Sequence, residues 1–335
     1  MYLPAEWHRQ AFVQLTWPHP DTDWAPMLDE VLDCYNHMAR EIAKRQPLLI
    51  VAGDPRLVDP TLRANVVPCP TNDTWARDHA FITLLSDNDR SATLLDYQFN
   101  GWGLKFPAHL DNQINVRILP HLPSRRHYQS CLDFVLEGGS IESDGKGTIL
   151  TTASCLLAPN RNNLPAPQIE QRLLSDLHAQ RILWLHHGHL QGDDTDGHID
   201  TLARFCPDDT IAYVQSTDPT DPQHADLKHM EAELQTFRTT DGRPYRLIPL
   251  PMPDAICDGN QRLPATYANF LIINGAVLCP TYRQPPHDHQ AMHQLQRAFP
   301  HHEIVPIDST PLIRQHGSLH CSAMQYPALA DEHKT

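Results

Sequence analysis

Residues 182–214, ILWLHHGHLQGDDTDGHIDTLARFCPDDTIAYV, contain two short apolar runs that a polar, Gly-containing loop separates. Runs of about four apolar residues bounded by turn residues are too short for helices and are typical of buried strands. The same order of apolar run, polar or Pro-rich loop and Gly-containing or charged cluster occurs five times. The five units begin at Val66-Val67-Pro68, Ile118-Leu119-Pro120, Ile182-Leu183-Trp184-Leu185, Leu247-Ile248-Pro249 and Ile304-Val305-Pro306.

Amphipathic helical patterns lie between these units. Residues 28–42 repeat apolar side chains at helical spacing, and three further helices are expected around residues 169–177, 227–237 and 292–299. We therefore expect an α/β protein built of repeated strand-loop-strand-helix units. Five such units could close radially into a propeller, which protects the edges of the sheets, and an ordinary two-layer α/β domain is the alternative.

The composition is that of an acidic globular protein. With 335 residues, of which 41% are hydrophobic, and no dividing linker, a single domain over residues 1–335 is expected. The formal net charge of −14 and the lack of a Lys- or Arg-rich run argue against a nucleic-acid partner. No stretch approaches the roughly 20 apolar residues of a membrane span, so no membrane partner is expected. Formation of a homo-oligomer is left open.

Neither a disulfide framework nor a metal site is expected. The eight cysteines are scattered without a Cys-x-x-Cys pair, and the N-terminus lacks a basic or apolar leader, so a cytoplasmic location is expected. Three imidazoles in His186-His187-Gly188-His189 cannot easily converge on one ion, and no His-Glu-x-x-His pattern accompanies them. Phosphate-binding loops and the Gly-x-Ser-x-Gly elbow are missing too, which argues against nucleotide enzymes and serine hydrolases.

Two clusters carry the residue types of nucleophilic catalysis. If the chain is extended from His198, then His198 and Asp200 face the same side and could together transfer protons and hold a cation. A solvated acidic turn is the structural alternative. The stretch Gly317-Ser318-Leu319-His320-Cys321 brings a Cys to a flexible turn. Most lone cysteines are inert core residues, but a nearby base or cation would make this one a nucleophile.

Two further clusters suit a planar cation. Trp75 offers an aromatic face close to the carboxylate of Asp78, and Glu137 places a carboxylate on a turn that the following Gly138 permits. Each cluster taken alone is more often structural, since Arg77 could simply pair with Asp78.

Together these clusters resemble the agmatine deiminase family, which also contains the bacterial peptidylarginine deiminases. The similarity runs nearly end to end and implies a five-bladed, pseudo-symmetric α/β propeller of strand-strand-helix-strand units, a pentein-like fold that agrees with the fivefold pattern. Seven motifs occur in the family's order: Leu15-Thr16-Trp17-Pro18-His19, Trp75-Ala76-Arg77-Asp78, Phe99-Asn100-Gly101-Trp102-Gly103-Leu104-Lys105, Glu137-Gly138-Gly139-Ser140, Asp194-Thr195-Asp196-Gly197-His198-Ile199-Asp200, Tyr267-Ala268-Asn269-Phe270 and Gly317-Ser318-Leu319-His320-Cys321.

The resemblance also implies roles for individual residues. Cys321 would be the nucleophile and His198 the acid-base, while Asp78 and Asp200 would bind the guanidinium nitrogens and Glu137 would support the same pocket. A guanidinium is a poor electrophile and needs carboxylates to orient its N–H groups. No metal or organic cofactor is required. The further substrate-binding residues implied are Trp75, Asp194, Asn269 and Gly317.

The reaction expected from the resemblance is hydrolysis of a small cationic guanidine, agmatine, to N-carbamoylputrescine and ammonia through a thiouronium on Cys321. Ser140, Thr201 and the approach Gln315-His316 depart from residues frequent in the family, and these departures bear on the substrate more than on the reaction. Agmatine carries a second ammonium, for which Asp193 or Asp194 could serve.

Three alternatives remain. The substrate could be peptidyl-arginine or free arginine, in which case Arg204 or Arg283 could bind the nearby carbonyl or carboxylate. The adduct could pass to an amine, which would make the chain an amidinotransferase. A binding protein without activity is disfavoured, because the proposed catalytic set is complete.

Overall fold

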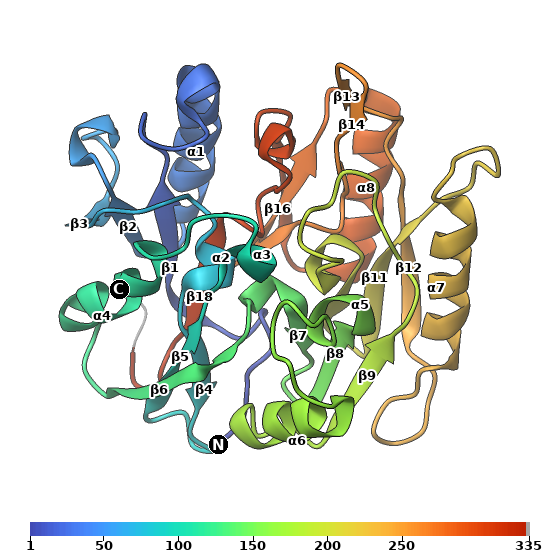
Figure 1. Cartoon of the computed structure of the whole chain (residues 1–335), viewed down its shortest axis with the longest axis horizontal. Helices are drawn as coiled ribbons and strands as arrows, with labels where there is room; N and C mark the ends of the chain where they lie inside the picture. Colours follow the sequence, from blue (N-terminus) through green and yellow to red (C-terminus); the bar gives the residue numbers. More distant parts are fainter. Residues whose placement is uncertain (333–335) are drawn as a thin grey trace.

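The computed structural model describes residues 1–332, and its strands form five sheets that repeat one arrangement (Figure 1). In each sheet an antiparallel pair is followed by a parallel pair, which needs a long crossover. Four sheets have three strands each. The first consists of β4 (Ile82–Leu85), β5 (Ala92–Gln98) and β6 (Arg126–Val135), and the second of β7 (Ile141–Ser143), β8 (Thr148–Thr152) and β9 (Arg181–Leu185). The third consists of β10 (Ala203–Cys206), β11 (Thr210–Gln215) and β12 (Arg246–Pro251), and the fourth of β15 (Leu271–Ile273), β16 (Ala276–Thr281) and β17 (Glu303–Asp308).

The fifth sheet joins the two ends of the described chain. Its β1 (Gln10–Trp17) pairs antiparallel with β18 (Ala323–Pro327) and parallel with β2 (Leu48–Ala52), which in turn pairs with β3 (Ala64–Pro68). Pairing the last strand with the first covers an edge that would otherwise be open. A small hairpin of β13 (Cys257–Asp258) and β14 (Gln261–Arg262) lies outside the five sheets.

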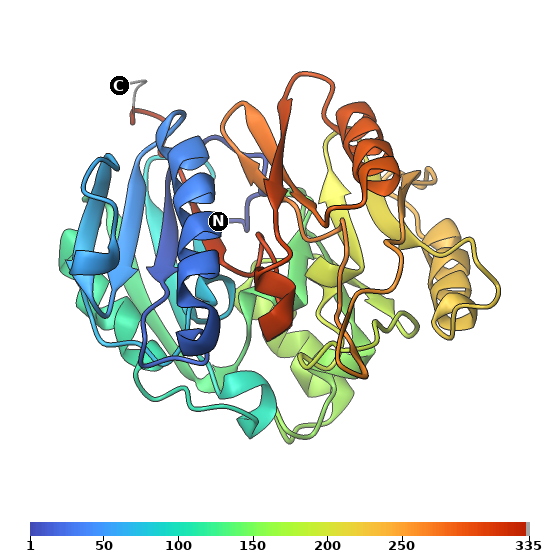
Figure 2. The ribbon, with the colours of Figure 1, turned by 90° about the horizontal axis from the view of Figure 1, so that it is seen from above.

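Helices make the crossovers between parallel strands. In α1 (Leu28–Ala43) the predicted apolar face is confirmed, with Val31, Tyr35 and Met38 fully buried. Figure 2 shows α1 (blue), α7 (yellow) and α8 (orange-red) against their sheets, with the red segment near residue 315 close to the middle of the molecule. The other α-helices are α2 (Ala76–His79), α3 (Gly101–Leu104), α4 (Ile114–Ile118), α5 (Ala153–Leu156), α6 (Ala166–Asp176), α7 (His224–Thr236) and α8 (Pro285–Ala298).

The repeated α/β architecture agrees with the fivefold pattern of the sequence, with two local corrections. Ile118-Leu119-Pro120, predicted to begin a strand, ends α4 and forms η4 (Leu119–His121), because Ile114 and Ile118 are both buried at helical spacing. The segment after His198 is not extended: Ile199–Thr201 form the 3-10 turn η6. Among the described residues, no helix is both long enough and apolar enough to span a bilayer.

Candidate active site

Each sheet contributes one segment to a common site, and in every case it is the segment just before the edge strand of the sheet's antiparallel pair. Asp78 lies in α2 before β4, and Gly139 lies in the 3-10 turn η5 (Gly138–Ser140) before β7. Asp200 lies in η6 before β10, Asn269 precedes β15, and Cys321 precedes β18. The repeated unit therefore brings together five segments that are far apart in the sequence, in the central region around α2 in Figure 1.

Cys321 is held between an amide donor and a carboxylate. Its side chain is 6% exposed, and the Asn269 amide donates to Sγ at 3.1 Å. The thiol lies 3.6 Å from Oδ2 of Asp200. Burial, together with the carboxylates of Asp200 and Asp78, raises the pKa of Cys321 well above its ordinary value. The thiol is therefore neutral near neutral pH, and a nearby cation would help to ionise it.

The two carboxylates differ in their partners. Asp78 accepts from the backbone N–H of Gly139 and from the indole of Trp102, both at 2.9 Å, and burial raises its pKa to about 6. Asp200 is fully buried, and its Oδ2 lies 2.7 Å from Nδ1 of His320. Burial opposes ionisation of Asp200, but contact with His320 lowers its pKa. Its Oδ1 has no hydrogen-bond partner within residues 1–332, so it is free to accept from a ligand.

His198 faces the same space from the other side. It is fully buried, its Nδ1 lies 3.7 Å from Oδ1 of Asp78, and neither ring nitrogen has a hydrogen-bond partner in the described chain. Burial lowers the pKa of His198, but Asp78, Cys155 and Glu137 outweigh that effect and raise it well above the ordinary value. The ring is therefore cationic near neutral pH and can give up a proton.

Gly139 marks the point where these groups converge. A Cβ on Gly139 would lie 2.7 Å from Nδ1 of His198, 2.9 Å from Asp78 Oδ1 and 3.0 Å from Asp200 Oδ2. Only glycine leaves that space free for the two carboxylates and the imidazole. Gly317 is constrained in a similar way, since a Cβ there would lie 2.2 Å from the ring of Trp75.

Glu137, like His198 and Asp200, lies beneath the residues that line the pocket, and its carboxylate is within 4.8 Å of a ring nitrogen of His198. Its carboxylate is fully buried and pairs with the guanidinium of Arg161 at 2.8 Å. Arg161 also binds the carbonyl of Thr195 at 2.8 Å and the carboxylate of Asp196. This pair therefore ties η5 to the loop that leads to His198.

The pocket over Cys321 has an acidic mouth. Asp23, Asp73 and Asp194 line it together with the predicted Trp75, Asp78 and Gly317. Burial and the nearby Asp23 raise the pKa of Asp73 to about 6. The residues that line the pocket are Asp23, Asp73, Trp75, Asp78, Trp102, Phe106, Asp194, Thr195, Thr201, Gln315, His316, Gly317 and Cys321, and this set contains neither Lys nor Arg.

The two arginines considered for a carboxylate are engaged elsewhere. Arg204 is fully buried and binds Glu142, Glu6 at 2.6 Å and the carbonyl of Phe270 at 2.7 Å. Arg283 is mostly exposed and pairs with Asp308 at 2.9 Å. The histidine run also lies apart from the pocket, with His187 paired to Asp226 at 3.1 Å.

Sequence reasoning missed several residues that shape the site. Trp102 lies inside a quoted motif, and its position between Gly101 and Gly103 is the sequence signal that could have singled it out. In the structure its backbone is left-handed (φ 54°), and its indole donates to Asp78. Arg161 and His320 had no comparable local signal, because their partners are 24 and 120 residues away.

Comparison with known proteins identifies relatives along nearly the whole chain. The profile of the Porphyromonas-type peptidyl-arginine deiminase family matches residues 2–327. A crystal structure from Porphyromonas gingivalis, described as a proposed arginine deiminase, is 51% identical, covers 97% of this chain and 98% of its own, and superimposes with a TM-score of 0.91.

Two relatives carry the name agmatine deiminase. The substrate-bound C. jejuni structure is 36% identical, covers 98% of this chain and 96% of its own, and has a TM-score of 0.91. The Pseudomonas aeruginosa (strain LESB58) enzyme is 32% identical over 97% of this chain and 95% of its own length. The chain therefore belongs to the Porphyromonas-type peptidyl-arginine deiminase family.

Proposed function

We propose that this protein hydrolyses agmatine to N-carbamoylputrescine and ammonia, with Cys321 as the nucleophile. The observation that carries the proposal is a buried thiol that lies 3.6 Å from the carboxylate of Asp200 and lines a pocket together with the carboxylate of Asp78. The two carboxylates favour the binding of a planar cation and disfavour that of an anion. Relatives that are named agmatine deiminases and match over nearly the whole chain support the same reaction.

The chemistry follows from the charges of the site. Asp78 and Asp200 accept hydrogen bonds from the guanidinium, whose positive charge lowers the pKa of the Cys321 thiol so that it loses its proton to solvent. The thiolate attacks the central carbon to give a tetrahedral intermediate. His198 protonates the departing nitrogen, and ammonia leaves a thiouronium on sulfur. The same imidazole then takes a proton from water, which adds to the carbon and releases the ureido product and the thiolate.

The acidic mouth favours agmatine over the other guanidines. Agmatine ends in an ammonium, which Asp194, Asp73 or Asp23 can meet. Free arginine carries a carboxylate as well, and the pocket lining, which lies wholly within the described residues, offers it no Lys or Arg. Arg204 cannot turn toward it without leaving Glu142 and Glu6 uncompensated in the interior.

The test is ammonia release from agmatine, free arginine and a blocked arginine peptide, without an added acceptor amine. We expect kcat/KM for agmatine to exceed the others by at least about a hundredfold. Equal or greater turnover of either arginine substrate would overturn the choice of agmatine. Ammonia release that requires an acceptor amine would indicate an amidinotransferase instead.

A matched pair of substrates tests the acidic mouth directly. We expect Asp194→Asn to raise KM for agmatine by roughly tenfold while leaving KM for butylguanidine, which lacks the ammonium, nearly unchanged. An equal effect on both substrates would show that Asp194 does not recognise the distal charge.

A further inference from the structure

A line of buried charged groups runs behind the catalytic pocket and ends at the N-terminal segment. His320 is fully buried between two carboxylates. Its Nδ1 lies 2.7 Å from Oδ2 of Asp200, and its Nε2 lies 2.7 Å from Oε1 of Glu6. Glu6 is therefore connected through one imidazole to a carboxylate of the proposed guanidinium site, although it is 314 residues away in sequence.

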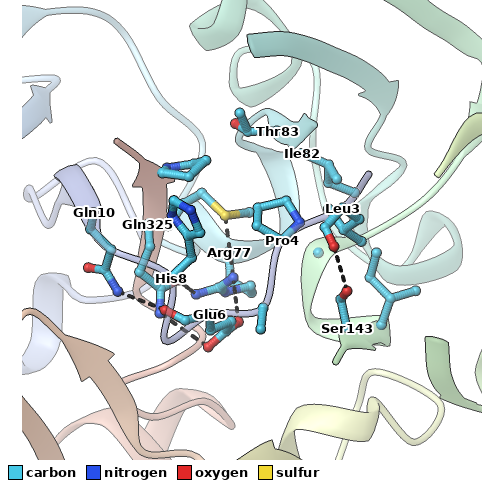
Figure 3. A pocket seen from close by; sticks show the side chains of 15 residues that line it. Leu3, Pro4, Glu6, His8, Gln10, Arg77, Ile82, Thr83, Ser143 and Gln325 are labelled. Atoms are coloured by element: carbon cyan, nitrogen blue, oxygen red, sulfur yellow. Dashed lines mark hydrogen bonds and ion pairs between the residues drawn. The ribbon is translucent and has the colours of Figure 1, made fainter. Parts of the chain in front are cut away.

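Glu6 is held firmly in the ionised state. Arg77 reaches its Oε1 at 3.0 Å, and Arg204 reaches its Oε2 at 2.6 Å. Gln325 donates to Oε2 at 3.1 Å. Figure 3 shows Glu6, Arg77 and Gln325 in contact beside a second pocket. The residues that line this second pocket are all different from those that line the catalytic pocket. Burial opposes ionisation, but His320, Arg77 and Arg204 lower the pKa of Glu6 well below its ordinary value.

The two short contacts of His320 require two hydrogens. A neutral imidazole supplies only one, so a second proton must be shared between His320 and Asp200, because Glu6 is ionised. Burial and the guanidinium groups of Arg204 and Arg77 lower the pKa of His320 and oppose a second proton on the ring, whereas Glu6 and the hydrogen bond to Asp200 favour it. Glu142 is a further charged neighbour of this array, and it binds Arg204 without bonding to His320. His198 and Asp78 face Asp200 from the other side: the charge of His198 favours ionised Asp200, and that of Asp78 opposes it.

This arrangement bears directly on the nucleophile. The oxygen of Asp200 that His320 contacts, Oδ2, is also the oxygen that lies 3.6 Å from the sulfur of Cys321. With a proton between His320 and Asp200, the carboxylate repels a thiolate less, and its Oδ1 stays free for the substrate. Without that proton, Asp200 would carry its full negative charge beside the sulfur.

We propose that Glu6 and His320 are positioning residues that fix the orientation and charge of Asp200 and thereby favour the Cys321 thiolate. The part of this inference that concerns turnover rests on the proposed deiminase function. The part that concerns the thiolate does not, because it can be measured on the free protein.

The thiolate is measured by the pH dependence of iodoacetamide alkylation at Cys321, followed by the mass of its peptide. Cys257 is an exposed cysteine in the same chain and serves as the internal reference. We expect Glu6→Gln to shift the Cys321 profile upward by about one pH unit, since loss of an opposite charge removes the second proton from His320. The Cys257 profile should not move.

Glu142→Gln is the matched control. Both substitutions remove a carboxylate from buried Arg204, but only Glu6 touches His320. Burial raises the pKa of Glu142, and Gln preserves the size and shape of this side chain. We expect this variant to keep the wild-type alkylation profile. Equal shifts in both variants, or in neither, would overturn the proposal.

Turnover of agmatine supplies a second readout. We expect kcat/KM to fall about a hundredfold in His320→Ala and only about tenfold in His320→Asn, whose amide can still donate to Asp200. Equal losses in the two variants, each with a wild-type thermal midpoint, would contradict the positioning role. If the wild type turns over no agmatine but Glu6→Gln still shifts the alkylation profile, only the proposed function fails.

Discussion

Cys321 is a poor nucleophile in the free protein, because burial and two carboxylates oppose its ionisation. The side chain nevertheless carries the whole proposed reaction. We expect Cys321→Ser to lower ammonia release by at least about a thousandfold, because a hydroxyl ionises far less readily than a thiol. The thermal midpoint should stay close to that of the wild type, and Cys257→Ser, at an exposed position, should keep full activity. Substantial turnover by the Cys321 variant would assign the nucleophile elsewhere.

Asp78 illustrates the cost of building such a site. Its pKa rises from 3.8 to about 6 on folding, chiefly through burial. Between these pH values the unfolded chain ionises and the folded chain does not, so stability falls as the pH rises from about 4 to about 6 and then levels off. The loss amounts to about 2–3 kcal/mol.

Asp78→Asn removes this titration. We expect its stability relative to the wild type to improve across that pH window, while ammonia release is largely lost. Thermal or urea unfolding of both proteins at pH 4 and pH 7 measures the effect. An unchanged difference between the two proteins would mean that the Asp78 pKa is not raised.

At the scale of single elements, the short turn η5 sets the geometry of the site. Gly139 donates its N–H to Asp78, and its missing side chain leaves the space into which Asp78, Asp200 and His198 point. We expect Gly139→Ala to reduce kcat/KM by about a hundredfold or more, because a displacement near 1 Å at the reacting groups suffices for that.

Gly275→Ala provides the control for backbone effects at glycine. Gly275 has a φ of 75° and nothing within 4 Å of the added Cβ, so the substitution should cost stability by about 1 kcal/mol without affecting turnover. If Gly139→Ala also kept normal turnover, the three groups would not depend on the space at η5.

At the scale of the whole molecule, the chain ends hold the sheets together. Beyond β18, Glu332 forms a bidentate ion pair with the buried guanidinium of Arg126 on β6, with N···O distances of 2.6 and 2.9 Å. We expect Glu332→Gln to lower the free energy of unfolding by about 1–3 kcal/mol, because it weakens the compensation of a buried charge. Turnover should be unchanged.

The adjacent Asp331 offers a comparison, since it pairs with Arg125 at 2.8 Å on the exposed surface. Asp331→Asn should leave denaturant unfolding unchanged, because solvent screens exposed pairs. Equal effects at positions 331 and 332 would show that burial of Arg126 does not govern the strength of this link.

Much of the fold was predictable because it repeats a local pattern. Short apolar runs and amphipathic segments such as residues 28–42 place apolar side chains at the spacing of a strand or a helix. This spacing can be recognised in the local sequence without knowing which distant residues the segment packs against. The prediction failed at Ile118, where three apolar or proline residues fit a strand as well as the end of a helix. It failed again after His198, where the backbone turns instead of extending.

Sequence by itself determined the kinds of groups available, namely a Cys after a Gly-Ser approach, a His two residues before an Asp, and a Trp near an Asp. Only the tertiary structure decided which of them meet. The acids at the pocket mouth, the burial of Arg204 and the contact of Glu6 with His320 depend on how five sheets join and how β1 closes on β18. Such contacts join residues tens to hundreds of positions apart, and no local periodicity records them, because they arise from packing and charge compensation after the elements have formed.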